Sequence, residues 1–90
     1  MNPILSIRTS AGLNRREFAI LLGVSTVCVQ HAEVGITANP KRILVGLARE
    51  GFDVRSVSRD YFAWRKLQAE AIRLRKRDTL ARLRSLHNPG

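Results

Sequence analysis

The feature that most constrains the fold is a pair of short amphipathic segments, joined by a tight turn, within residues 13–35. Asn14 and Ser25 each stand immediately before an apolar-periodic run, which is where the N-cap of a helix belongs. Gly35 stands after the second run, where a glycine commonly caps the C-terminus. The sequence therefore predicts two short consecutive helices with a sharp change of direction between them.

The spacing inside this pair is more specific than either helix alone. Two helices that cross closely need a small residue in the first, a turn residue tolerant of positive φ, and an apolar anchor under the second. Ala19, Gly23 and Val29 supply these three features in the required order. We therefore predict a helix-turn-helix with helices over residues 15–22 and 26–34. The predicted inward positions are Phe18, Ala19, Leu22, Val29 and Ala32.

The same segment resembles the helix-turn-helix of the phage-repressor or Cro-like family, also called Xre-like, and aligns with its usual pattern without a gap. The resemblance spans roughly residues 4–55 and is carried by Leu13, Asn14, Glu17, Phe18, Ala19, Leu21, Leu22, Gly23, Val24, Ser25, Val29, Glu33 and Gly35. It implies an all-α, lambda-repressor-like bundle of four helices. It also implies a transcriptional repressor that binds a palindromic operator in double-stranded DNA as a homodimer.

Two further segments have the apolar spacing of helices. Asn2 and Pro3 have the pattern of an N-cap followed by a first helical residue, before an apolar stripe. Asn39 and Pro40 repeat this signature before a run that stops at Gly51. We therefore expect a first and a fourth helix, with Asn39 as the N-cap of the fourth.

A long terminal helix is predicted because no Gly or Pro occurs between Phe52 and Pro89, and Arg, Leu, Ala and Lys dominate this part of the chain. The helix begins between Val54 and Asp60, and if unbroken to about residue 86 it would extend about 40–45 Å at 1.5 Å per residue. A second helix starting near Asp78 is the alternative. The predicted organisation is a helix-turn-helix domain over residues 1–55 and a basic C-terminal helical extension over residues 56–90.

The apolar side chains of the extension need something to pack against. One interpretation is that Tyr61, Phe62 and Trp64 partly cover the first and fourth helices of the same chain. The sharper interpretation is a two-fold dimer seam with the same helix of a second copy, because symmetric dimers bind palindromic half-sites. The seam residues would be Trp64, Leu67, Ala71 and Leu74.

The charge balance indicates a polyanionic partner, because 16 Lys and Arg residues stand against 7 Asp and Glu, for a formal net charge of +9. The helix-turn-helix itself is nearly neutral, so the excess lies mainly in the extension. We expect a dense basic run there to lie near phosphate, although a solvated helical face is the commoner fate of such runs. The run consists of Arg73, Arg75, Lys76 and Arg77.

On the second helix of the motif, the positions that point away from the core are expected to contact bases in the major groove. They are Thr26, Val27, Gln30 and His31. Gln30 suits paired bonds to adenine and Val27 suits a thymine methyl, while His31 would either pair with phosphate when protonated or be solvated. Backbone phosphates are expected at helix starts and caps, which are occupied by Asn14, Arg15, Arg16, Ser25, Lys41 and Arg42.

Two alternatives remain open. Val27, Cys28, Val34 and Ile36 make the reading side more apolar than is usual in the family, which would suit a protein-binding module such as an antitoxin or inhibitor. A low-specificity nucleic-acid binder acting through the arginine-rich tail is the other.

Several classes are disfavoured. A single cysteine makes no internal disulfide and no cluster has zinc-ligand spacing, so we expect no metal or other cofactor and a reducing cytoplasm. Without paired carboxylates, a nucleophile beside a base or a glycine-rich phosphate loop, the chain is not expected to be an enzyme. No apolar run has the length of a membrane span, so no membrane partner is expected.

Overall fold

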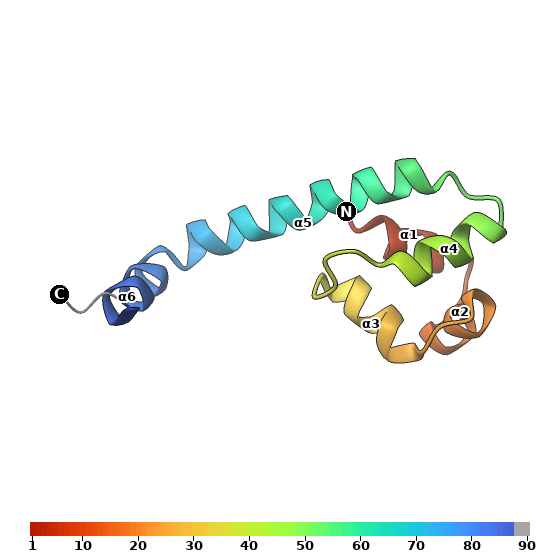
Figure 1. Ribbon diagram of the computed structural model, residues 1–90, viewed down its shortest axis with the longest axis horizontal. Helices are drawn as coiled ribbons and strands as arrows, with labels where there is room; N and C mark the ends of the chain where they lie inside the picture. Colours follow the sequence, from red (N-terminus) through yellow and green to blue (C-terminus); the bar gives the residue numbers. More distant parts are fainter. Residues whose placement is uncertain (88–90) are drawn as a thin grey trace.

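The computed structural model describes residues 1–87, which form six helices and no strands. The helices are α1 (Pro3–Ser10), α2 (Arg15–Leu22), α3 (Thr26–Val34), α4 (Lys41–Arg49), α5 (Val54–Arg75) and α6 (Arg77–His87). The all-α prediction is confirmed. Helices α1 to α4 and the start of α5 form one bundle, and the rest of α5 projects from it with α6 at its far end (Figure 1).

Local capping explains why α2 and α3 begin and end where they do. The side chain of Asn14 accepts a hydrogen bond from the backbone amide of Glu17, whose carboxylate accepts one from the amide of Asn14, so α2 begins with a capping box. The hydroxyl of Ser25 accepts a hydrogen bond from the amide of Cys28 at the start of α3. Gly23 ends α2 at φ +70°, a left-handed conformation that glycine adopts without strain.

The prediction that Asn39 caps α4 is wrong. Helix α4 begins at Lys41, Pro40 occupies the cap position, and no side chain caps the helix. Pro40 has φ −78° and ψ +58°, and the amide of Lys41 donates to the carbonyl of Asn39 at 2.8 Å. This is an inverse γ-turn, which places Asn39 one residue too far from the helix to cap it.

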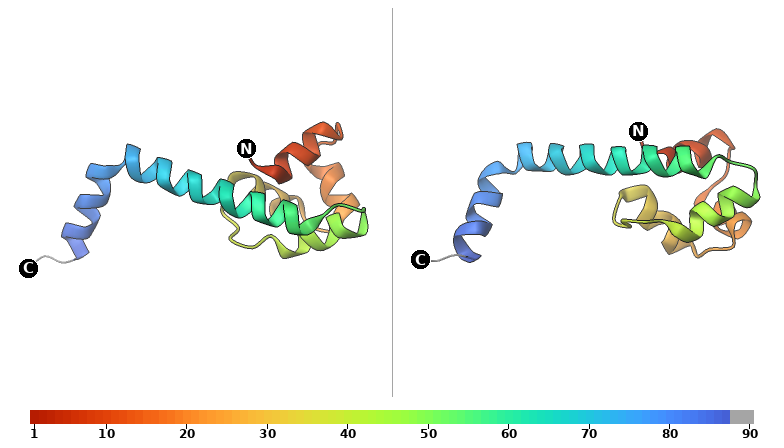
Figure 2. Two further views of the ribbon diagram at one scale, coloured as in Figure 1. Left: turned by 90° about the horizontal axis from the view of Figure 1, so that it is seen from above. Right: turned by 45° about the horizontal axis from the view of Figure 1, so that its top comes forward.

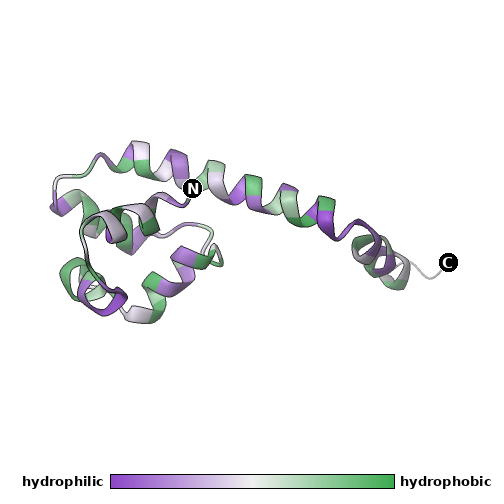
Figure 3. Cartoon of the chain, turned by 180° about the vertical axis from the view of Figure 1, so that it is seen from behind, coloured by the Kyte–Doolittle hydropathy of each residue, from purple (hydrophilic) through white to green (hydrophobic). Residues whose placement is uncertain are grey.

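The core lies between the four short helices and the first turns of α5. It is formed by Ile4, Phe18, Ala19, Leu22, Val29, Ala32, Ile43, Leu47, Val57 and Tyr61. All five inward positions predicted for the helix-turn-helix are among these buried residues. Hydrophobic residues also continue along α5 after it leaves the bundle (Figure 3).

The terminal helix is broken. Helix α5 ends at Arg75, Lys76 leaves the helical conformation at φ −112°, and α6 begins at Arg77. Helix α6 turns away from the axis of α5 (Figure 2). The break therefore lies two residues before Asp78, which falls within the first turn of α6. Within residues 1–87, no single helix is both long enough and apolar enough to cross a membrane.

Helices α2 and α4 approach so closely that only glycine fits at one contact. A Cβ atom at Gly46 would lie 2.9 Å from both the Cβ atom and the carbonyl oxygen of Leu22. Backbone cannot move aside as a flexible side chain can. The absence of a side chain at Gly46 therefore sets the distance between the end of α2 and the middle of α4.

We expect Gly46→Ala to lower the free energy of unfolding by about 1–3 kcal/mol, the usual cost of overpacking, although alanine is the better helix former. Urea denaturation followed by circular dichroism measures the change. Ala48→Gly, at an exposed site in the same helix, calibrates the propensity contribution. A Gly46→Ala protein as stable as the parent would show that the contact between α2 and α4 is not limiting.

Candidate nucleic-acid interface

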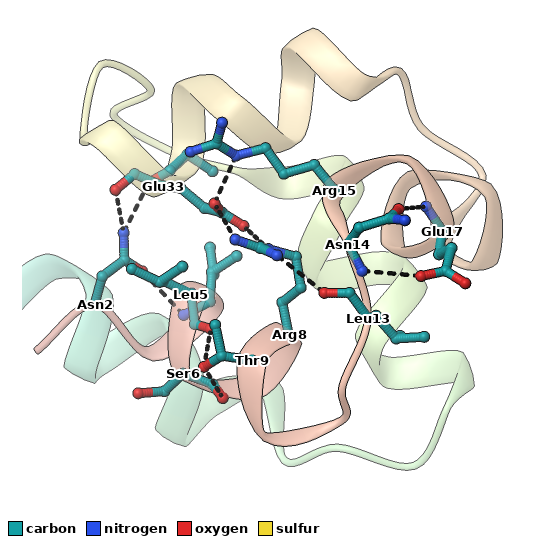
Figure 4. Close-up of polar contacts among 12 residues, drawn as sticks. Asn2, Leu5, Ser6, Arg8, Thr9, Leu13, Asn14, Arg15, Glu17 and Glu33 are labelled. Carbon is teal, nitrogen blue, oxygen red and sulfur yellow. Dashed lines mark hydrogen bonds and ion pairs between the residues drawn. The ribbon is translucent and has the colours of Figure 1, made fainter.

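Helix α3 is held from its inner side by a buried carboxylate. Glu33 is packed next to Val29 and Ala32, and its side chain is only 1% exposed. One carboxylate oxygen accepts hydrogen bonds from Arg15 Nε at 3.0 Å and Arg8 Nη2 at 3.1 Å, and the other accepts from Arg8 Nε (Figure 4). The hydrogen bond to Glu33 raises the pKa of Arg8, so this cation is always present. The carboxylate thus joins α3 to both α1 and α2.

The C-terminal end of α3 is fixed by side chains from outside the helix. The side-chain amide of Asn2 donates to the carbonyls of Ala32 and Glu33, at 3.0 and 2.9 Å. The hydroxyl of Tyr61 lies 3.1 Å from the carbonyl of Ala32 and 2.7 Å from that of Thr37. Burial raises the pKa of Tyr61, which keeps the hydroxyl protonated as a donor. The bonds to Ala32 and Glu33 serve carbonyls of the last turn of α3, which have no amide four residues further along the helix to accept from.

The turn of α5 that follows Tyr61 also holds the C-terminal end of α3. Arg65 Nε donates to the carbonyl of Gly35 at 3.0 Å. The ring of Trp64 covers Gly35 so closely that a Cβ atom there would lie 2.9 Å from it. Trp64 also lies 5.8 Å from the ring of Tyr61 and packs against the core, so it is half-buried within its own chain.

The opposite side of α3 is open. Thr26, Val27, Gln30 and His31 are all exposed, and none of their side chains makes a hydrogen bond within the described part of the chain. They share one face because positions 26, 27, 30 and 31 follow the helical spacing of one, four and five residues. The structure therefore presents the four predicted base-reading residues side by side and accessible.

Two pairs of cations stand at the starts of α2 and α4. Arg15 and Arg16 occupy the first turn of α2, and Lys41 and Arg42 occupy the first turn of α4. Lys41 and Arg42 line one shallow depression with the turn between α2 and α3, and another with Cys28 of α3. The N-terminus of a helix carries a partial positive charge, which repels these cations. An anion bound between them would therefore be stabilised by both the side chains and the helix dipole.

The two capping residues among the predicted phosphate-binding residues already use one polar atom each within the chain. Asn14 and Ser25 each use a side-chain oxygen to cap a helix. The side-chain NH₂ of Asn14 and the hydroxyl proton of Ser25 are left as the groups able to donate to a phosphate.

The predicted basic run is not part of this surface. Arg73, Arg75, Lys76 and Arg77 are exposed near the junction of α5 and α6. Tyr61 is the residue of α5 that bonds to α3, and Arg75 follows it by fourteen positions. Arg75 therefore lies about 21 Å along the helix from that attachment. Of the predicted dimer residues, Leu67, Ala71 and Leu74 are exposed on the same projecting stretch, whereas Trp64 is half-buried.

Sequence reasoning did not identify the residues that hold α3 in place: Asn2 as a donor to α3, Arg8, Glu33 as an ion-pair partner, and Arg65. One signal was present, because Glu33 follows the inward-facing Val29 by four positions and a carboxylate on an inward face requires a cation. The partners themselves lie 18 to 31 residues away in the chain and no local pattern names them.

Comparisons with models of known protein families, with curated proteins and with solved structures find no match to this chain.

Proposed function

We propose that this chain is a helix-turn-helix, DNA-binding transcriptional regulator of the phage-repressor type, acting as a homodimer that occupies a palindromic operator and excludes polymerase. The observation that carries the proposal is the division of α3 into an inner side fixed by Glu33 and an outer side whose side chains are exposed. The crossing of α2 and α3 at 111° supports it, because helix-turn-helix pairs cross at about 90–120°.

In this proposal α3 lies in the major groove. Gln30 makes paired bonds to the N6 and N7 atoms of adenine, Val27 contacts a thymine methyl, and Thr26 bonds a base edge or a phosphate. His31, one turn after Val27, pairs with phosphate when its imidazole is protonated. The rigid attachment of α3 supports direct readout, since base-edge contacts require fixed donor positions.

Phosphates would be bound at the starts of α2 and α4. The backbone amides of Arg15 and Arg16 point out of the first turn of α2, as unpaired first-turn amides do. Glu33 orients Arg15 through Nε, which leaves its two terminal nitrogens able to donate. Helix α4 has no acidic residue in its first turn and no side-chain cap, so an anion at Lys41 and Arg42 would complete it.

A second candidate function is supported by the apolar side chains on the same side of the molecule. Val27, Val34 and Ile36 are each more than half exposed. Such a surface suits a protein-binding module, an antitoxin or inhibitor built on the same scaffold, in which α3 contacts a protein partner.

Selection of bound sequences from a random duplex pool tests the proposal directly. We expect recovery of sites with two-fold symmetry. Recovery of no duplex at moderate salt would contradict the DNA-binding proposal and favour the protein-binding module. Enrichment of sites without any shared sequence would favour the low-specificity binder.

Gln30→Ala is expected to relax the preference at one base position by about 1–3 kcal/mol, because it removes a bidentate base contact. Arg16→Gln is the matched comparison, since its exposed guanidinium makes no ion pair in the described residues and it should weaken binding to every sequence alike. Fluorescence anisotropy on a panel of single-base operator variants measures both. Identical base preferences in Gln30→Ala and the parent would rule out readout by Gln30.

We also propose that the basic run binds phosphates flanking the operator. Replacing Arg73, Arg75, Lys76 and Arg77 with Gln should then reduce the slope of log affinity against log salt by roughly 0.9 for each phosphate that the variant no longer neutralises. The measurement is a salt titration of duplex affinity for the parent and the quadruple variant. An unchanged slope would show that the basic run does not contact phosphates. Loss of all sequence-independent binding in the quadruple variant would favour the low-specificity binder that acts through the arginine-rich tail.

A further inference from the structure

The projecting part of α5 has two faces of different chemistry. At 100° per residue, one sector about 120° wide contains no Lys or Arg over residues 60–75. We call this sector the cation-free face, and it consists of Asp60, Ala63, Trp64, Leu67, Glu70, Ala71 and Leu74. The cations of the same stretch lie outside it, at Arg65, Lys66, Arg73 and Arg75.

The cation-free face has five uncharged apolar residues and two carboxylates, it is accessible, and it is continuous with a groove in the bundle. Leu67 is 61% exposed and Leu74 is 78% exposed. Ala63, Trp64 and Leu67 also line a groove between α5 and α1, together with Met1, Pro3, Ser6, Ile7, Val57 and Asp60. Helix α1 flanks α5 on one side when the molecule is seen from above (Figure 2, left). No other described element covers Leu67, Ala71 or Leu74.

We propose that the occupant of this face is the same face of a second copy of the chain, packed antiparallel about a two-fold axis. Charge selects this occupant. A polyanion is attracted to the opposite sides of α5, where the cations lie, whereas two copies with a net charge of +9 each can approach only where cations are absent. Asp60 and Glu70, the carboxylates of this stretch of α5, both lie on the cation-free face.

The side chains fix a register. Leu67 opposite Leu74 of the second copy pairs the two exposed leucines twice, and the axis then passes between Glu70 and Ala71. The small side chain of Ala71 allows the helices to approach at the centre. The two symmetry-related Glu70 carboxylates approach each other near the axis and repel. Lys66 and Arg73, one turn on either side of Glu70, reduce this repulsion.

A stable interface buries about 800 Å² on each partner. This is about an eighth of the 6702 Å² that the chain exposes.

This register has a consequence for DNA, which rests on the proposed function. Tyr61, which is attached to α3 through Ala32, lies about 14 Å from the axis, so the two Tyr61 residues are about 28 Å apart along α5. Half-sites one helical turn apart are separated by about 34 Å. Tyr61 and Arg65, which hold α3, lie about a third of a turn around α5 from the seam, so both α3 helices face the same side of the pair.

Sedimentation velocity at micromolar concentration without DNA tests the dimer. The parent should sediment as a dimer and the double variant Leu67→Glu, Leu74→Glu as a monomer with unchanged circular dichroism, since both side chains are exposed in the single chain. Leu86→Glu is the matched control, because Leu86 is 79% exposed but lies on α6. A monomeric parent, a dimeric double variant, or dissociation by Leu86→Glu alone would overturn the proposal.

Cysteine cross-linking in a Cys28→Ser background tests the register. Mixing Leu67→Cys and Leu74→Cys proteins should give the mixed disulfide as the main oxidised product, and Lys66→Cys should give none. Cross-linking of Leu67→Cys mainly to itself would indicate parallel helices and contradict the proposal. These measurements involve no DNA, so they separate the two proposals. A dimer that binds no duplex would overturn DNA binding and leave the dimer, whereas a monomer that selects single half-sites would overturn the dimer and the palindromic operator and leave DNA binding by α3.

Discussion

The ion pairs of Glu33 with Arg8 and Arg15 are the interaction on which the rest of this structure depends. They connect α3 to α1 and to α2, and the carboxylate that they share is buried, although the side chain of Arg15 is 45% exposed. A buried carboxylate that loses a partner is strongly unfavourable, so α3 cannot rotate about its axis without a large cost. Asn2 and Tyr61 add a second constraint at the end of the helix. The outer face of α3 is therefore fixed in direction although it makes no contact of its own.

The second principle of the molecule is the separation of charge and apolar surface. Cations at the starts of α2 and α4 reduce the stability of those helices, which is consistent with a surface arranged for an anion. Along α5 the cations occupy one side and exposed leucines the other. On our proposals, the polyanion and the second copy therefore occupy different surfaces of this strongly basic chain.

Local patterns were sufficient to predict much of the fold. The bounds of α2 and α3 follow from Asn14, Ser25 and two glycines, because caps act within a few residues. The same reasoning failed at Asn39, where Pro40 forms a γ-turn, and it did not identify Lys76 as the break in the terminal helix. The exposed face of α3 followed from helical periodicity. The partners of Glu33 could not be predicted, because they come from distant segments that only the tertiary fold brings together.

The most direct test of the account is a nuclear magnetic resonance titration of the labelled protein with a selected duplex. We expect the largest amide shift changes on the exposed residues of α3 and on the first turns of α2 and α4, and slow amide exchange at the buried residues Val29, Ala32 and Glu33 both with and without the duplex. Shift changes confined to α5 and α6, with α3 unaffected, would contradict the claim that the fixed outer face of α3 reads DNA.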